Sequence, residues 1–193
     1  MAVISLLVIC IAGALYLWIR NRPAGRARTP GSELPRENAG RVKVDIALAI
    51  PIDFLGPAAA AGRNAEAAIK LNELEKAWGY YQEQKSLYML HASKSKLTSR
   101  QALALDASVS IEMANILRLE GRHQEALAHV LYWAIGTSNL NTERRDQKVR
   151  AYFNRCELKR TRFHEVVDHV ESSKGLTDLR SVQAKVREWI EKG

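Results

Sequence analysis

Charge is absent from the start of this sequence. No Asp, Glu, Lys or Arg occurs between Ala2 and Ile19, and these 18 residues would span about 27 Å as a helix, close to the thickness of a bilayer's hydrocarbon core. Tyr16 and Trp18 lie near the end of the stretch, where amphipathic aromatic rings favour the headgroup level. We therefore expect residues 2–19 to form a transmembrane anchor.

The stretch also lacks the usual features of a removable signal. A secretory signal peptide carries positive charge before a shorter apolar run, whereas only Met1 precedes this one. A lipoprotein signal has a small residue before its cysteine, but Ile9 precedes Cys10. The Ala-x-Ala pattern at Ala12-Gly13-Ala14 keeps a cleaved signal peptide open as the alternative to a permanent anchor.

Positive charge is confined to the C-terminal flank of the apolar stretch. Because flanks rich in Lys and Arg stay on the cytoplasmic side, we predict a single-pass membrane protein with its N-terminus out and its soluble domain in the cytoplasm. The juxtamembrane residues that carry this prediction are Arg20, Arg22, Arg26 and Arg28.

Residues that carry chemistry are sparse. The only two cysteines, Cys10 and Cys156, lie in different parts of the chain, which makes an intramolecular disulfide implausible, and no glycine-rich phosphate-binding loop occurs. His164 and His169 are five residues apart, whereas a helical zinc pair requires a spacing of four. His164 and Asp168 have that spacing but no evident third ligand. We predict no catalytic residue, no metal site and no cofactor, and therefore not an enzyme.

Two short segments follow the apolar stretch. Residues 20–40 are rich in Pro, Gly and Arg, carry a net charge of +3 and contain few large apolar residues, which predicts a disordered basic linker. Residues 41–50 alternate apolar and polar, as a strand does, but no second strand pattern follows to pair with them. We expect residues 41–63 to be extended, either along the helical domain or against a partner's sheet edge.

From Asn64 to the end of the chain, residues 64–193, the pattern is helical. Thr98 to Gln101 fits a capping box, and Gly121 supplies a helix stop. The helix between them has one apolar stripe, and a second helix follows and ends at Gly136, so the pair predicts a helical hairpin. The stripe consists of Leu103, Ala107, Ile111, Ala114 and Leu117.

Part of this unit recurs forty residues later. Arg122 to Val130 reads RHQEALAHV, and Arg162 to Val170 reads RFHEVVDHV. Periods of this length are typical of helical arrays. A further, looser hairpin is expected over about Asn64–His91, and a final helix is expected to cap the stack through Leu179, Val182, Val186 and Trp189.

The hairpin resembles the tetratricopeptide repeat. The family's small and large positions match Met113, Ala114, Leu117, Gly121, Ala126 and Val130. Ser110 departs from the pattern where a large residue is usual, and Trp133 departs where a small one is, which predicts an irregular stack; the forty-residue period also exceeds the family's 34. The resemblance implies an all-α hairpin domain, either a solenoid or a bundle, that binds a partner's peptide and carries no catalysis.

Basic residues concentrate after the hairpin. The segment 141–162 has a net charge of +5, and five of its cations recur at spacings that would place them on one helical face. Such a face favours an acidic peptide or anionic lipid; nucleic acid is disfavoured because aromatic residues are few nearby. The predicted basic face consists of Arg144, Lys148, Arg155, Lys159 and Arg162.

These features predict a membrane-anchored, cytosol-facing adaptor that binds an unidentified protein partner near the bilayer. The alternative is a structural protein that engages anionic lipid through the basic face and the arginine-rich linker. A helical enzyme with a scattered site is the most remote of the three hypotheses.

The anchor can be tested by alkaline carbonate extraction of membranes. We expect the full chain to stay in the membrane pellet and a variant without residues 2–19 to move to the supernatant, because only the apolar stretch holds the chain in lipid. A mature chain that begins near residue 15 in a secreted or periplasmic fraction would contradict the anchor.

Overall fold

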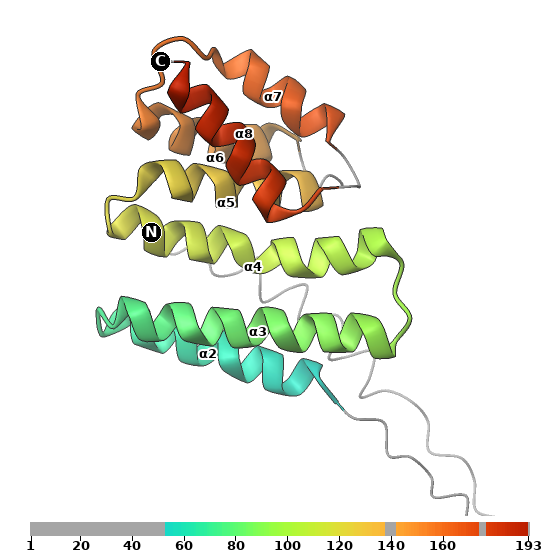
Figure 1. Cartoon of the computed structure of the whole chain (residues 1–193). Coiled ribbons are helices and arrows are strands. Elements are labelled where there is room, and N and C mark those ends of the chain that lie inside the picture. The colour runs from blue at the N-terminus through green and yellow to red at the C-terminus, as the bar shows by residue number, and fades with distance from the viewer. Residues whose placement is uncertain (1–52, 138–141, 174–176, 193) are drawn as a thin grey trace, which may run out of the picture. The chain divides into compact units, whose positions relative to one another are not determined.

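The computed structural model describes residues 53–137, 142–173 and 177–192, all within one compact unit, Ala49–Gly193. In these ranges the chain forms seven α-helices and one short 3-10 helix, packed largely as antiparallel hairpins (Figure 1). No strand occurs there. The elements are α2 (Leu55–Lys70), α3 (Leu74–Lys94), α4 (Ser99–Leu119), α5 (His123–Gly136), α6 (Thr142–Phe153), η1 (Asn154–Cys156), α7 (Phe163–Ser172) and α8 (Leu179–Glu191).

None of the described helices is long and apolar enough to cross a membrane. The expected anchor at 2–19, the expected linker at 20–40 and the alternating residues 41–50 lie outside the described residues. The anchor and the linker therefore stay predictions.

The first described helix begins earlier than the sequence suggested. α2 starts at Leu55, so residues 55–63 are helical, and the expectation of an extended segment is wrong for them. The Asp53 carboxylate accepts hydrogen bonds from the backbone N–H groups of Leu55 and Gly56 at 2.9 and 3.1 Å, which caps the helix. Pro57 falls in the first turn, where a helix tolerates proline because the N–H has no partner there.

α2 packs closely on α3 and forms the first hairpin. The buried face of α2 is a stripe of small side chains, Ala58, Ala61, Ala65 and Ala68. A Cβ placed on Gly62 would lie 3.1 Å from the Gln84 amide of α3, which shows how closely the two helices approach. The hairpin expected over about Asn64–His91 is therefore present, but its helices extend from Leu55 to Lys94.

Three successive helix ends share one backbone motif. In each, a residue with positive φ follows the helix, and the next residue's N–H bonds back to a carbonyl in the last turn, as in a Schellman motif. The positive-φ residues are Asn72, Lys96 and Gly121, and the closing bonds run from Glu73 to Ala68, Leu97 to Ala92 and Arg122 to Leu117 at 2.8 to 2.9 Å. The predicted stop at Gly121 is confirmed.

α4 begins with the predicted capping box. The Gln101 N–H donates to the Thr98 hydroxyl at 3.3 Å, and the Thr98 N–H donates to the Gln101 side chain at 2.9 Å. The helix buries two faces rather than one. The predicted stripe packs toward α5, and a second stripe of Val109, Met113 and Ile116 packs toward α2 and α3. α4 therefore joins the two parts of the core.

α5 is the central helix of the second part of the core. Its residues 126–135 are all buried, so no side of this stretch is left to solvent. α4 covers one side, and α6, α7 and α8 pack against other parts of it (Figure 1). As predicted, the final helix packs its apolar side inward: Val182, Val186 and Trp189 are buried, and Leu179 lies against the same cluster.

Gly121 should be needed for its backbone conformation alone. Its φ is +76° and an added Cβ would meet no atom within 4 Å, so Gly121→Ala should cost about 1 kcal/mol of unfolding free energy without any steric clash. Gly79, in the middle of α3, has equally open surroundings, and Gly79→Ala should stabilise by about 0.5–1 kcal/mol. Urea titration of both variants measures the difference. If Gly79→Ala lowers the free energy of unfolding, or Gly121→Ala leaves it unchanged, this explanation of the two glycines is wrong.

Candidate functional site

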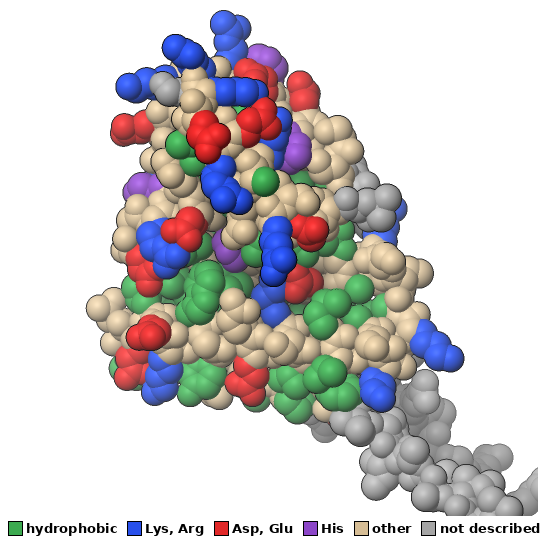
Figure 2. Space-filling model, viewed as in Figure 1, with side chains coloured by type: hydrophobic (Ala, Val, Ile, Leu, Met, Phe, Trp, Pro, Cys, Tyr) green, Lys and Arg blue, Asp and Glu red, His purple; other side chains and the backbone are tan. Residues whose placement is uncertain are grey.

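The predicted basic residues do not share one helical face. α6 ends at Phe153, so only Arg144 and Lys148 lie on it, whereas Arg155 belongs to η1 and Lys159 lies in the turn before α7. Arg162 is the residue that caps α7. The single-helix geometry is therefore wrong, because the left-handed residue Glu157 (φ +50°) ends the helical segment. All five side chains are nevertheless exposed, and Figure 2 shows Lys and Arg side chains, mixed with Asp and Glu, at the end of the molecule where α6, α7 and α8 lie.

Several cations of α6 and η1 pack on aromatic rings. The Lys148 ammonium lies 5.4 Å from the centre of the Trp133 ring, and the Arg150 guanidinium lies 3.9 Å from that of Phe163. The Arg155 guanidinium lies 5.8 Å from the Tyr152 ring. Such contacts stabilise a cation by about 0.5–1 kcal/mol when exposed. Part of the positive charge predicted for binding therefore also contributes to packing.

Arg145 is buried, which the sequence analysis did not predict. Its guanidinium is 1% exposed and bridges Glu171 of α7 at 2.6 Å and Asp146 at 2.9 Å. Burial lowers the pKa of Arg145, but the hydrogen bonds to Glu171 and Asp146 outweigh that effect, and the net change is upward. The sequence held a signal: Arg145 stands four and seven residues before the buried Val149 and Tyr152, on the same face of α6.

Beyond Cys156 the chain forms a strongly positive turn, residues 157–162, which we name the basic turn. It carries Lys159, Arg160 and Arg162, all exposed. No carboxylate within the described parts of the chain forms an ion pair with any of the three. Glu165, the nearest acidic residue in α7, accepts a hydrogen bond from the backbone N–H of Arg162 at 3.0 Å, not from its guanidinium.

The repeated sequence forms equivalent structures in α5 and α7. Arg122 and Arg162 stand at the starts of these helices, each three residues before a glutamate. Seven residues after each arginine stands a histidine whose ring meets a tryptophan edge to face. The ring centres of His129 and Trp78 lie 5.6 Å apart, and those of His169 and Trp189 lie 5.5 Å apart. In each histidine one buried ring nitrogen, Nδ1 of His129 and Nε2 of His169, has no hydrogen-bond partner.

The two helix starts differ in charge. The Arg122 guanidinium contacts the Glu125 carboxylate at 2.6 and 2.7 Å and the Glu120 carboxylate at 3.0 Å, so this turn is neutralised. The hydrogen bond from Arg122 lowers the pKa of the Glu125 carboxyl, and the burial of that carboxyl is too slight to reverse the shift. At the start of α7 the positions before Arg162 hold Lys159 and Arg160 instead of a glutamate. The arginine is thus matched by two carboxylates in one copy, whereas the other copy holds three cations, Lys159, Arg160 and Arg162, beside Glu157 and Glu165.

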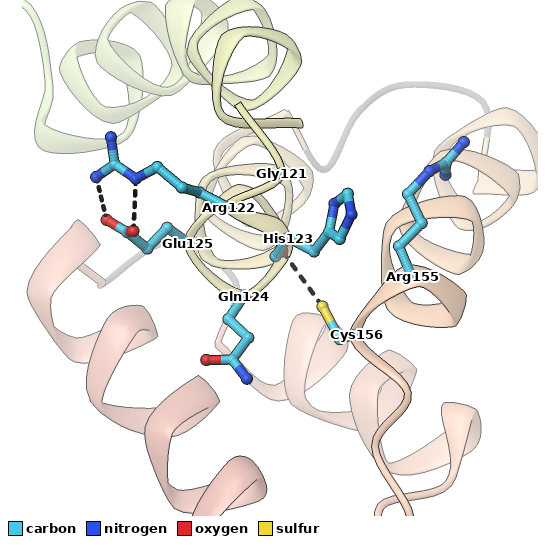
Figure 3. Close-up of a pocket in the computed structure, with 7 residues that line it drawn as sticks. All are labelled: Gly121, Arg122, His123, Gln124, Glu125, Arg155 and Cys156. Carbon is cyan, nitrogen blue, oxygen red and sulfur yellow. Dashed lines mark hydrogen bonds and ion pairs between the residues drawn. The ribbon is translucent and has the colours of Figure 1, made fainter. Parts of the chain in front are cut away.

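A pocket of about 250 Å³ lies where the α4–α5 turn meets η1 (Figure 3). The His123 ring and the Arg155 side chain stand on its two sides with Cys156 between them, and the Arg122–Glu125 pair lies on the far side of His123. The Cys156 thiol donates a hydrogen bond to the carbonyl of His123 at 3.2 Å. Burial raises the pKa of this thiol to about 11, so it is not an activated nucleophile at neutral pH.

A polar cluster links α3, α4 and α5 inside the domain. The Lys85 ammonium lies 3.1 Å from the Asp106 carboxylate, which also accepts a hydrogen bond from the Tyr132 hydroxyl at 2.7 Å. Burial and this hydrogen bond raise the pKa of Tyr132 above its usual range. Ser110, at the position where the repeat resemblance would place a large residue, is buried beside Lys85.

Within residues 53–137, 142–173 and 177–192, no three or more His, Cys, Asp or Glu side chains are grouped so as to hold a metal ion. His164 is exposed, and His169 packs on Trp189. The juxtamembrane residues Arg20, Arg22, Arg26 and Arg28 lie outside the described residues.

Comparison with known proteins shows no matching family model, no similar curated protein and no similar solved structure. The all-helical hairpin arrangement is therefore established from the chain itself, without a family assignment.

The buried histidines should make stability depend on pH. Burial above all, with a smaller effect of Lys85 and Arg122, lowers the pKa of His129 to about 4, although Glu125 and Asp106 act in the opposite direction. An exposed histidine titrates near 6.5, so the unfolded chain takes up more protons between these values, and stability should fall by roughly 3 kcal/mol as the pH drops from 6.5 to 4. Burial and Lys185 lower the pKa of His169 too, which adds to the loss.

Urea titrations at pH 7 and pH 4.5 measure this effect. His129→Phe keeps an aromatic ring beside Trp78 but cannot be protonated, so its loss of stability on acidification should be smaller than that of the unmodified chain. Equal losses for the two proteins would show that His129 is not the group responsible.

Proposed function

We propose that this chain is a membrane-anchored, cytosol-facing adaptor whose helical domain binds an acidic segment of a protein partner at the basic turn. The hairpin arrangement supports an interaction module, which is what the resemblance to tetratricopeptide repeats implies. The anchor predicted at residues 2–19 would hold that module, and with it the partner, close to the bilayer.

The observation that carries the proposal is the difference between the two equivalent helix starts. At α5, the arginine is paired with Glu120 and Glu125, so a positive charge at this position of the fold can be neutralised locally. At the basic turn, Lys159, Arg160 and Arg162 are exposed and have no described carboxylate as partner. Because like charges placed together repel, the cluster costs stability unless a negatively charged partner binds it.

An acidic protein segment accounts for more features than a lipid surface does. The pocket beside η1 adjoins the positively charged residues, and a peptide side chain could enter it whereas a flat headgroup layer would not. The predicted basic residues Arg144 and Lys148 on α6 extend the positive surface away from this pocket. Nucleic acid is less favoured, because Phe153 and Phe163 pack against the core instead of offering free faces for base stacking.

Charge reversal of the basic turn tests the proposal. We expect Lys159→Glu, Arg160→Glu and Arg162→Glu together to abolish binding of an acidic peptide, hexaglutamate, because attraction becomes repulsion. The matched control reverses three exposed cations on α2 and α3, Arg63, Lys70 and Lys94, which changes the net charge equally and should leave binding within about two-fold. Affinity is measured by calorimetry on the full chain in uncharged micelles, and circular dichroism verifies folding.

Vesicles of phosphatidylcholine with and without phosphatidylserine separate the two partner classes. If the triple reversal removes only peptide binding, the adaptor function stands. If it removes only binding to the phosphatidylserine vesicles, the lipid-engaging function replaces it. If it changes neither, the basic turn is a solvated surface, and the proposal is wrong.

A further inference from the structure

The pocket between the α4–α5 turn and η1 adjoins the basic turn through a shared segment of chain. Arg155 and Cys156 line the pocket, and the chain then passes through Glu157 into Lys159, Arg160 and Arg162. Cys156 of the pocket and Lys159 of the basic turn are three residues apart in the chain, a separation that one extended peptide can span. We infer that the pocket is an anchoring subsite that takes one carboxylate side chain of the acidic partner; this inference rests on the proposed function.

The charges that line the pocket favour an anion. Glu125 is the acidic residue of the lining, and its carboxylate is held by Arg122 at 2.6 and 2.7 Å. Arg155 has no such partner among the described carboxylates; its guanidinium donates to the Ala151 carbonyl and lies over the Tyr152 ring. A guanidinium has five N–H donors, so most of them are left for a ligand. Arg155 is therefore the cation of the lining with no described carboxylate beside it, whereas Arg122 is matched by Glu120 and Glu125.

The thiol and the ring of the lining add no negative charge. The Cys156 thiol stays protonated and donates its hydrogen to the His123 carbonyl, so it adds no negative charge. The His123 ring faces Arg155 across the pocket (Figure 3), and its Nδ1 has no hydrogen-bond partner. Arg155 is therefore the charged side chain on this side of the pocket, opposite the His123 ring.

A carboxylate fits this arrangement better than a phosphate group. One uncompensated guanidinium matches the single charge of a carboxylate and can bind both of its oxygens at once. A phosphate monoester carries nearly two negative charges at pH 7 and would require a second free cation, whereas Arg122 is already engaged by two glutamates. The pocket thus complements an Asp or Glu side chain of the partner.

The experiment uses the full chain in uncharged micelles, with acetylated and amidated hexaglutamate as the probe. The pocket is read out by NMR of ¹³C-labelled histidine, with His123 assigned among the five histidines from a His123→Gln sample. We expect the probe to shift the His123 signal. We also expect Arg155→Gln to remove that shift and to weaken binding about 10-fold, the effect of losing a charge-assisted bidentate contact.

The matched control is Arg160→Gln, which removes the same charge from the basic turn but not from the pocket. It should weaken binding only about 2- to 3-fold and leave the His123 shift in place. If both variants lose affinity equally and the probe never shifts His123, the pocket is not a subsite, although the adaptor function stands. If hexaglutamate does not bind the unmodified chain at all, the adaptor function fails, and the subsite fails with it.

Discussion

The burial of α5 is the constraint on which the second part of the domain depends. Ten consecutive residues of this helix, 126–135, are buried, so it exposes apolar groups in every direction and cannot be stable without cover on all sides. α4, α6, α7 and α8 supply that cover, although η1 and the turns between them follow no regular hairpin pattern. The first hairpin, α2–α3, is joined to this core through the second face of α4.

Ion pairs with at least one buried or half-buried partner connect the helices that surround this core. Lys85 and Asp106 join α3 to α4, and Arg145 and Glu171 join α6 to α7. A buried pair gains little net stability because desolvation offsets the attraction, but removal of one partner leaves an uncompensated charge. Such pairs therefore oppose alternative packings of the helices more than they strengthen the native one.

The repeated motif shows which of its features the fold uses. Both copies keep the arginine, the glutamate three residues later and a histidine against a tryptophan, and in both the following valine is buried. The copies differ most in the second and third residues before the arginine, Leu119 and Glu120 in one and Lys159 and Arg160 in the other, and all four are exposed. Substitution of these exposed residues changes the free energy of unfolding little. The charge at this position can therefore differ between the two copies while the packing of α5 and α7 stays the same.

The sequence by itself determined the helical class, the capping box at Thr98, the stop at Gly121 and the inward side of α8, because caps and apolar periodicity act within a few residues. It also located the excess of positive charge. Only the tertiary structure decided that α6 stops at Phe153, that Arg145 is buried against Glu171 and that Arg155 reaches a pocket at the start of α5. The pairing of Arg145 with Glu171 and of Cys156 with His123 joins residues 26 and 33 positions apart in the chain, and no local pattern encodes which partners meet. The expectation of an extended segment failed at residues 55–63, where packing of the alanine stripe on α3 accompanies the helix.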